Sequence, residues 1–326
     1  MKTATRRQVM SSIATLAASV ALPARAQAPY PAGIGTIKIV IPFAPGGASD
    51  LIGRLLAESL SRRWGVSAPV EHVPGGSATV GIGRVANGPK DGSQIAILGL
   101  NYVTTQFIMS QLPYDPERDI VPLAQLTRQP NLLCVRKDLP VDSVAELIAY
   151  ARANPGKLNY ASSGVGSPLH LAAELFKHMT HIEMVHVPFA GSAPSQNALA
   201  GGHVDVLFDN AAAIISLARS GAVKPLAITT PARLALAPEF PPVAETVPGY
   251  AAGGWFAAGV SGGTPKAIQD TIRSACLALL QEPTTIERLS ATLSESVGTT
   301  GEDLAQFIQD ERKRWGSLIR DLKIRA

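Results

Sequence analysis

Short β-branched runs alternate with amphipathic helical segments along most of this chain. Residues 37–41 read Ile-Lys-Ile-Val-Ile, the pattern of a buried strand, and residues 95–98 repeat that pattern. Between these runs, Leu51, Leu55 and Leu56 fall on one face of a predicted helix. Strands that are joined by helices pair in parallel, and the helices then cover both faces of the sheet. The sequence therefore predicts an α/β fold.

The length of the chain predicts two lobes, because a single hydrophobic core usually stops growing at about 250–300 residues. We expect residues 128–230 to form one lobe, lobe II. Residues 27–127 and 231–326 are expected to form lobe I together, so the chain would cross twice between the lobes. Each lobe is predicted to be a mostly parallel sheet flanked by helices.

Residues 1–26 have the pattern of a secretory signal peptide. Lys2, Arg6 and Arg7 give a basic start, an apolar run follows, and residues 24–26 (Ala-Arg-Ala) supply the small residues of a cleavage site. The apolar run is shorter than the roughly 20 residues that cross a bilayer. The arginine pair also resembles a twin-arginine signal, although we expect ordinary secretory export. The pattern predicts a soluble periplasmic protein.

The charge of the exported chain argues against nucleic acid as a partner. The whole chain has 29 Lys and Arg residues and 25 Asp and Glu residues, for a formal net charge of +4. Four of the basic residues and none of the acidic ones lie in residues 1–26, so the remaining chain is formally neutral. A protein that binds phosphate backbones needs a basic excess.

The cysteines and the sequence motifs predict no disulfide, no metal and no cofactor. Cys134 and Cys276 both lie in apolar runs, which indicates two separate buried thiols even though export would permit a disulfide. The histidines at 178, 181 and 186 match no zinc spacing. The Walker, dinucleotide-binding and nucleophile-elbow motifs are also missing from the sequence.

Two loops of small residues lie between a predicted strand and a predicted helix. They are residues 45–50 (Pro-Gly-Gly-Ala-Ser-Asp) and residues 162–167 (Ser-Ser-Gly-Val-Gly-Ser). Helix N-termini carry free N–H groups and attract anions, and ligands of α/β sheets bind at the carboxyl ends of strands. Two such loops could hold an anion between the lobes, with Asp209 and Asn210 as a third wall. Each loop alone is equally well explained as an ordinary capped turn, and Ser167 followed by Pro168 is itself a typical helix start.

Several segments together resemble the Bug (TctC-like) family of tripartite tricarboxylate transporter receptors. The resemblance covers nearly the whole exported chain, and the segments that carry it are residues 41–50, 112–116, 154–162, 185–194, 201–205 and 208–210. It implies a two-lobed periplasmic binding fold of type II. It also implies a small carboxylate that is held between the two loops, partly by backbone amides.

The resemblance and the residue types give a set of candidate binding residues. The first loop supplies Phe43, Ala44, Gly46, Gly47, Ser49 and Asp50. The other side supplies Ser162, Gly164, Gly166, Ser167, Asp209 and Asn210. The chain departs from the family pattern at residues 71–77 and at Val165, which makes an apolar or aromatic carboxylate conceivable as the ligand.

Three functions remain open at this level. We expect a monomeric solute-binding receptor, without catalysis, that delivers a carboxylate to the membrane subunits of a tripartite tricarboxylate-type transporter. The first alternative is a periplasmic sensor that presents its ligand to a membrane kinase. The second is a periplasmic enzyme on the same fold, for which Ser162, His170 and Asp209 would have to converge.

Overall fold

The computed structural model describes residues 30–189 and 191–325, so the predicted signal peptide lies outside the described residues. Ile34–Ala326 form one compact unit, and the described residues that precede it form a turn. Among the described residues, no helix combines the length and the apolar character that a membrane crossing requires.

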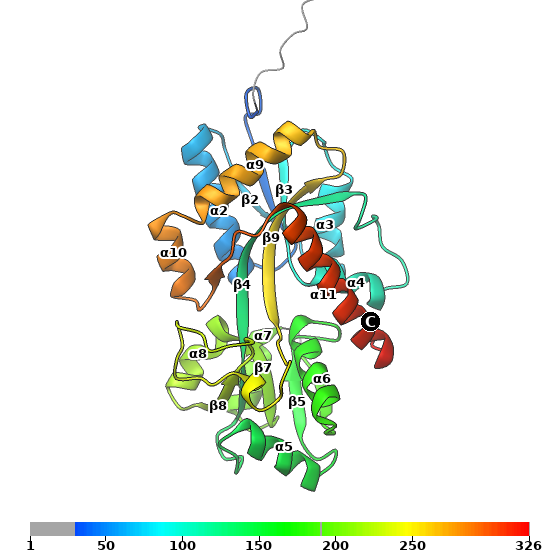
Figure 1. The fold of residues 1–326 in the computed structure, drawn as a ribbon, viewed down its shortest axis with the longest axis vertical. Helices are drawn as coiled ribbons and strands as arrows, with labels where there is room; N and C mark the ends of the chain where they lie inside the picture. The colour runs from blue at the N-terminus through cyan, green and yellow to red at the C-terminus, as the bar shows by residue number, and fades with distance from the viewer. Residues whose placement is uncertain (1–29, 190, 326) are drawn as a thin grey trace, which may run out of the picture. The chain divides into compact units, whose positions relative to one another are not determined.

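The compact unit is built on a mixed β-sheet with helices packed against it, and Figure 1 shows how these elements are arranged. In spatial order the main strands are β2 (Val70–His72), β1 (Lys38–Ile41), β3 (Gln94–Leu98), β9 (Gly253–Ser261), β4 (Ile120–Arg136), β7 (Val206–Asn210), β5 (Asn159–Ser162) and β6 (Val185–Pro188). Two further strands, β8 (Val223–Ile228) and β10 (Glu295–Ser296), pair with β4. The predicted α/β fold class is confirmed.

The parallel strands carry the helices that position the site. β1 pairs in parallel with β2 and β3, and β5 pairs in parallel with β6 and β7. Each of these strands leads into a helix at its carboxyl end. The helices are α2 (Ala48–Trp64), α3 (Thr79–Ala86, after the short 3-10 turn Gly76–Ala78), α4 (Asn101–Ile108), α6 (Pro168–Thr180), α7 (Ser192–Ala200) and α8 (Ala211–Arg219). The remaining helices are α5 (Val144–Ala153), α9 (Lys266–Leu279), α10 (Pro283–Ser290), α11 (Gly301–Asp321) and the 3-10 turn Val243–Glu245.

The long strand β4 joins two groups of strands, which we name group 1 (β1, β2, β3, β9 and β10) and group 2 (β5 to β8). β4 pairs antiparallel with β9 as far as Pro130, and from Asn131 onward it pairs antiparallel with β7. β4 and β9 both run from one group toward the other in Figure 1. The alternating pattern did not predict these antiparallel strands. The lobe boundaries at 127/128 and 230/231 stay a prediction.

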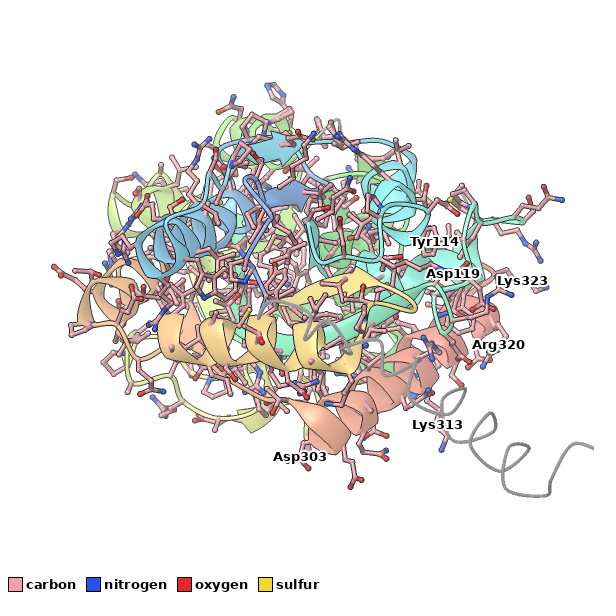
Figure 2. All side chains as sticks on the ribbon, turned by 90° about the horizontal axis from the view of Figure 1, so that it is seen from above. Tyr114, Asp119, Asp303, Lys313, Arg320 and Lys323 are labelled. Atoms are coloured by element: carbon pink, nitrogen blue, oxygen red, sulfur yellow. The ribbon has the colours of Figure 1, made fainter. Side chains whose placement is uncertain are left out.

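Helix α11 closes the chain against β4 and α4, and its charges suit its direction. The first turn carries Glu302 and Asp303, and the last turn carries Arg320. Figure 2 shows Asp303 near one end of this helix and Arg320 near the other. Acidic side chains at a helix N-terminus and basic ones at its C-terminus interact favourably with the helix dipole. Leu304 and Trp315 lie on the buried face of the helix.

The prediction of two separate buried thiols is confirmed. Cys134 lies in β4 and Cys276 in α9, and both are free and fully buried. Burial raises the pKa of Cys276 to about 12, and it raises that of Cys134 as well. Both side chains are therefore neutral members of the core.

Helix α3 lies so close to the end of β1 that only glycine fits at their contact. A Cβ atom added at Gly81 would lie 2.7 Å from the carbonyl oxygen of Val73 and 2.9 Å from the Cα of Pro42. Both neighbours are backbone atoms, which cannot rotate away. The contact fixes the point at which the chain leaves β1 for the first loop.

Replacing Gly81 with Ala should therefore destabilise the fold by about 1–3 kcal/mol through overpacking. Gly83 on the same helix is the matched control, because a Cβ there meets only side-chain atoms of Pro113 and Tyr114, at 3.3 and 3.4 Å. Both substitutions gain the same helix propensity. Denaturant unfolding of the two variants measures the difference. A Gly81→Ala variant as stable as Gly83→Ala would show that α3 can shift freely.

Candidate functional site

A cavity of about 900 Å³ lies at the carboxyl ends of the parallel strands and is lined from both strand groups. Helices α2, α4, α6, α7 and α8 all begin at its wall. Within each strand group the parallel strands bring their carboxyl ends to one edge, where the following helices begin. The two groups run in opposite directions along β4, and their carboxyl edges face each other near Pro130 and Asn131. Among the described residues that line the cavity, none is a lysine or an arginine, and Asp209 alone carries an ionisable side chain.

Seven of the predicted binding residues line this one cavity. They are Phe43, Ala44, Gly46, Gly47, Ser49, Asp209 and Asn210. The other five, which the lining does not include, support the loops behind it. They are Asp50, Ser162, Gly164, Gly166 and Ser167.

Two helix starts at the cavity have glycine as the N-cap residue. Gly47 precedes α2 and Gly191 precedes α7, and both glycines line the cavity. Glycine has no side chain that could satisfy the first N–H groups of a helix, so these donors remain available to a ligand. By contrast, the Ser167 hydroxyl caps α6, and the Asn210 side chain caps α8. The glycine-capped, open starts are therefore those of α2 and α7, while α4 begins after Leu100 and has no side-chain cap either.

The first loop is held in shape by Asp50. The Gly46 N–H donates to Asp50 Oδ2 at 3.0 Å, so this amide supports the loop instead of facing a ligand. Arg54 lies 2.8 Å from Asp50, and His72 lies 3.1 Å from it. Burial on its own would raise the pKa of Asp50, but the bond from Gly46 and the charges of Arg54 and His72 outweigh it and hold the pKa below its ordinary value.

His72 joins two parts of this loop. Its Nδ1 atom lies 3.0 Å from the carbonyl oxygen of Phe43, while its Nε2 atom faces Asp50. Both partners are acceptors, so the ring donates to both only when each nitrogen carries a proton. This histidine lies in the segment 71–77, where the sequence departs from the family pattern.

The second loop uses most of its own donors internally. The Gly164 N–H donates to Ser162 Oγ at 3.2 Å, and the Gly166 N–H donates to His170 Nδ1 at 3.1 Å. Ser167 accepts from the His170 N–H at 3.2 Å and thereby caps α6. Ser163 is the residue of this loop that lines the cavity. The expected open helix start on this side therefore lies one helix further along the chain, at α7.

Beneath the second loop, three rings stack in the interior. His186 lies between Tyr160 and His170, with ring centroids 4.8 Å and 4.1 Å away respectively. Its Nε2 atom is 2.6 Å from Ser162 Oγ. Burial, and then the neighbouring His186, lowers the pKa of His170 to about 4, and burial also lowers the pKa of His186. Both rings are therefore neutral at pH 7.

Asp209 is fully buried at the end of β7 and anchors the start of α7. Its carboxylate accepts from Ser192 Oγ at 2.5 Å, from Gln196 Nε2 at 2.6 Å and from the Asn210 N–H at 2.8 Å. Burial raises its pKa, although the bonds from Ser192, Gln196 and Asn210 oppose the rise. Asp209 therefore holds together the wall from which α7 begins.

Aromatic and aliphatic side chains form the rest of the wall. Phe43 and Phe256 meet edge to face, with their ring centroids 5.9 Å apart. Both line the cavity, as do Leu51, Leu100 and Leu169. A Cβ at Gly99 would lie 3.2 Å from both rings, so this glycine leaves room for them. The site thus combines an apolar body with a few polar groups, as small-molecule sites usually do.

The sequence analysis missed several polar residues of the cavity: Asn101, Gln129, Asn131, Ser192 and Gln196. Ser192 follows a glycine at a helix start, which is the signal that identified the first loop, so it could have been found. Gln129 and Asn131 lie within the long strand β4, where a run of alternating polar residues looks like an exposed strand.

No hydrogen bond in the described chain joins the residues considered for catalysis, Ser162, His170 and Asp209, to one another. Ser162 bonds to His186, His170 accepts from Gly166, and Asp209 accepts from Ser192, Gln196 and Asn210. Among the described residues, no group of three or more His, Cys, Asp or Glu side chains is arranged to hold a metal ion.

Residues 52–324 match the model of the tripartite tricarboxylate transporter family receptor. The chain belongs to this receptor family. Members of the family are solute-binding receptors, and the resemblance seen in the sequence is confirmed.

Several solved structures are similar to this chain in both sequence and fold. Rpa4515 of R. palustris, solved with adipate, is 36% identical, with a TM-score of 0.81 over 89% of this chain and 98% of that one. The periplasmic binding protein BugD is 27% identical, with a TM-score of 0.78 over 89% and 99%. MatC of Rhodopseudomonas palustris, with bound malate, is 28% identical, with a TM-score of 0.75 over 87% and 98%. These neighbours establish the two-lobed periplasmic binding fold.

The buried histidines predict a loss of stability in acid. The pKa of His170 falls from 6.5 to about 4 on folding, so the unfolded chain binds this proton first as the pH decreases. The contribution is complete above pH 6.5 and is lost toward pH 4, at a slope of up to about 1.4 kcal/mol per pH unit. Denaturant unfolding between pH 7 and pH 4 measures it.

The control for this titration is His170→Gln, which keeps an acceptor for the Gly166 N–H but does not titrate. Its unfolding free energy should depend less on pH across this window than that of the original chain. Identical slopes in the two proteins would show that His170 does not carry the effect.

Proposed function

We propose that this chain is an extracytoplasmic receptor that captures a small carboxylate in the cavity between the strand groups and delivers it to a tripartite tricarboxylate-type membrane transporter. The observation that carries the proposal is the pair of glycine-capped starts of α2 and α7 in one cavity whose described lining has no cation. Such starts attract an anion without a lysine or an arginine.

The open amides supply most of the expected recognition. In α2 the N–H of Asp50 donates to the Gly47 carbonyl, so the donors left for a ligand are those of Gly47, Ala48 and Ser49. On the other side α7 begins with Ser192 and Ala193, which line the same cavity and whose N–H groups have no side-chain cap. Hydrogen bonds to a charged acceptor are roughly twice as strong as neutral ones. We therefore propose that a carboxylate binds between these two helix starts.

The ligands of related proteins support this class of ligand. Rpa4515 was solved with adipate and MatC with malate, and both molecules are dicarboxylates. The apolar wall formed by Phe43, Phe256 and the leucines suits the carbon chain of such an acid. We propose that the predicted residues Phe43, Gly47 and Ser49 contact the ligand directly. Asp50, Ser162, Gly164, Gly166 and Ser167 would support the loops.

Capture would involve closure of the two strand groups around the ligand. The chain passes between the groups in β4 and β9, and β4 changes its pairing partner between Pro130 and Asn131. Bending at such element junctions is the usual hinge of two-lobed binding proteins. We also propose that the leader directs export to the periplasm and that the receptor acts as a monomer.

Isothermal titration of the purified chain with adipate, malate and other small mono-, di- and tricarboxylates tests the proposal. We expect at least one of these acids to bind at micromolar or lower concentration, and small-angle scattering should show compaction on its addition. Inorganic chloride serves as a control for nonspecific anion binding. Failure of every carboxylate in the panel to bind would refute the function.

A substitution at Gly47 should block the site without harming the fold. Gly47 has an ordinary φ of −92°, and a Cβ there meets only Ser49 Oγ, at 4.0 Å, so Gly47→Val places its methyl groups toward the cavity without strain. We expect the affinity for the best carboxylate to fall about tenfold or more, because the side chain covers donors of α2. Thermal unfolding should be nearly unchanged.

Gly46→Ala is the contrasting variant. Gly46 has a φ of +93°, which strains any L-residue by about 1–2 kcal/mol, while a Cβ there meets nothing within 4 Å. It should lower stability more than Gly47→Val does. Equal ligand affinity in the Gly47→Val variant and the original chain would show that the start of α2 is not part of the binding site.

A further inference from the structure

Two buried amide side chains belong to the cavity lining and have polar atoms without a partner in the described chain. Asn131 is 2% exposed and Gln129 is 1% exposed, and both line the cavity. Asn131 Nδ2 and Gln129 Oε1 have no hydrogen-bond partner among the described residues. A buried polar atom without a partner costs about 1–3 kcal/mol, so such atoms are normally satisfied.

The two amides lie on one face of β4, next to a glycine. They are two residues apart on β4, so their side chains lie on the same face of the strand. Gln129 pairs with Gly254, where a Cβ would lie 3.4 Å from Gln129 Oε1. Glycine at this position keeps the space in front of the amide open. Gly254 also lines the cavity.

Each of the two residues also forms hydrogen bonds with a neighbouring threonine. The Asn131 N–H donates to Thr229 Oγ1 at 2.8 Å, and the Thr229 hydroxyl lies 3.1 Å from the Asn131 carbonyl oxygen. Gln129 Nε2 donates to Thr127 Oγ1 at 2.5 Å. A hydroxyl can donate as well as accept, so either end of the Gln129 amide can be presented to the cavity. The backbone of Asn131 and the side chain of Gln129 are therefore held in place, and the pair forms a polar floor that suits either a donor or an acceptor.

A third unsatisfied amide on the same strand, Gln125, shows what is specific to this pair. Both polar atoms of Gln125 lack a partner among the described residues, yet Gln125 is not part of the cavity lining. Of the buried side-chain atoms without a partner in the described chain, those of Gln129 and Asn131 belong to the lining. Gln129 and Asn131 therefore adjoin a ligand in the cavity, whereas Gln125 does not.

We infer that Gln129 and Asn131 form a second polar subsite, which binds the end of the ligand that lies away from its first carboxylate. The inference rests on the proposed function and narrows the ligand class. The preferred ligand is a small carboxylic acid with an apolar middle, for the wall of Phe43 and Phe256, and a second hydrogen-bonding group for the floor. A simple monocarboxylic acid would leave both amides unsatisfied and would bind more weakly.

Three acids with six carbons each test the inference by isothermal titration of the full chain. Hexanoate has no second polar group, 6-hydroxyhexanoate has a neutral one, and adipate has a charged one. We expect one or both bifunctional acids to bind about tenfold or more tightly than hexanoate. The comparison between them distinguishes a neutral from a charged second group. Hexanoate binding as tightly as both would overturn the inference.

The variants Asn131→Leu and Gln129→Met keep the size of each side chain and remove its polar end. They should reduce the advantage of the bifunctional acid to less than about threefold, while hexanoate affinity stays the same or rises because the unsatisfied amide is gone. Gln125→Met is the matched control and should behave like the original chain. Loss of affinity for all three acids in equal proportion, or the same loss in Gln125→Met, would contradict the subsite.

The thermal stability of the variants distinguishes a binding role of these amides from a structural role. Removing an unsatisfied buried amide in favour of an apolar side chain of the same size is expected to be neutral or stabilising. Asn131→Leu should therefore melt at the same temperature as the original chain or higher, while its affinity falls. A variant that loses both stability and affinity would point to a structural role and overturn the inference. If none of the carboxylates binds, the proposed function fails, and this inference fails with it.

Discussion

Backbone N–H groups that have no partner inside their own helix govern the architecture of this site. Parallel strands gather the starts of five helices at one cavity, and each start needs acceptors from outside its helix. The protein satisfies α6 and α8 with the side chains of Ser167 and Asn210, but it leaves α2 and α7 to glycine caps. Asp50 and Asp209 then hold these two starts in position without occupying their first donors. In the proposed function, a bound carboxylate accepts hydrogen bonds from the donors that these two starts leave free.

The sequence predicted what is decided locally. The strand–helix order, the helix start at Ser167 and the burial of both cysteines depend on neighbouring residues and on hydrophobic patterning, and all are confirmed. The same local rule explains a weakness of the site prediction. A serine that caps α6 well also consumes a donor there, so the second loop offers fewer free amides than its composition indicates. Seven of the predicted residues nevertheless meet at one cavity.

Contacts between distant segments could not be predicted in this way. β4 is a strand of 17 residues that contains Pro122 and Pro130, and prolines argue against a central strand. Its register shifts close to Pro122, and it changes partner after Pro130, which is how the sheet accommodates both. Gln129 and Asn131 line the cavity only because this strand passes between the two groups. Nothing in their immediate sequence neighbourhood indicates that.

The described lining of the cavity has no lysine or arginine, and this affects how ligand binding responds to salt. The field of a helix end fades over the first turn, whereas the field of a lysine or arginine reaches across a Debye length of about 10 Å at 0.1 M salt. For the proposed carboxylate receptor, long-range electrostatic attraction of the ligand should therefore be weak, and the affinity should depend little on salt concentration. Selectivity between ligands then depends on the shape of the cavity and on hydrogen-bond geometry at short distance. A weak dependence on salt would suit the proposed periplasmic location, where the ionic strength varies with that of the medium.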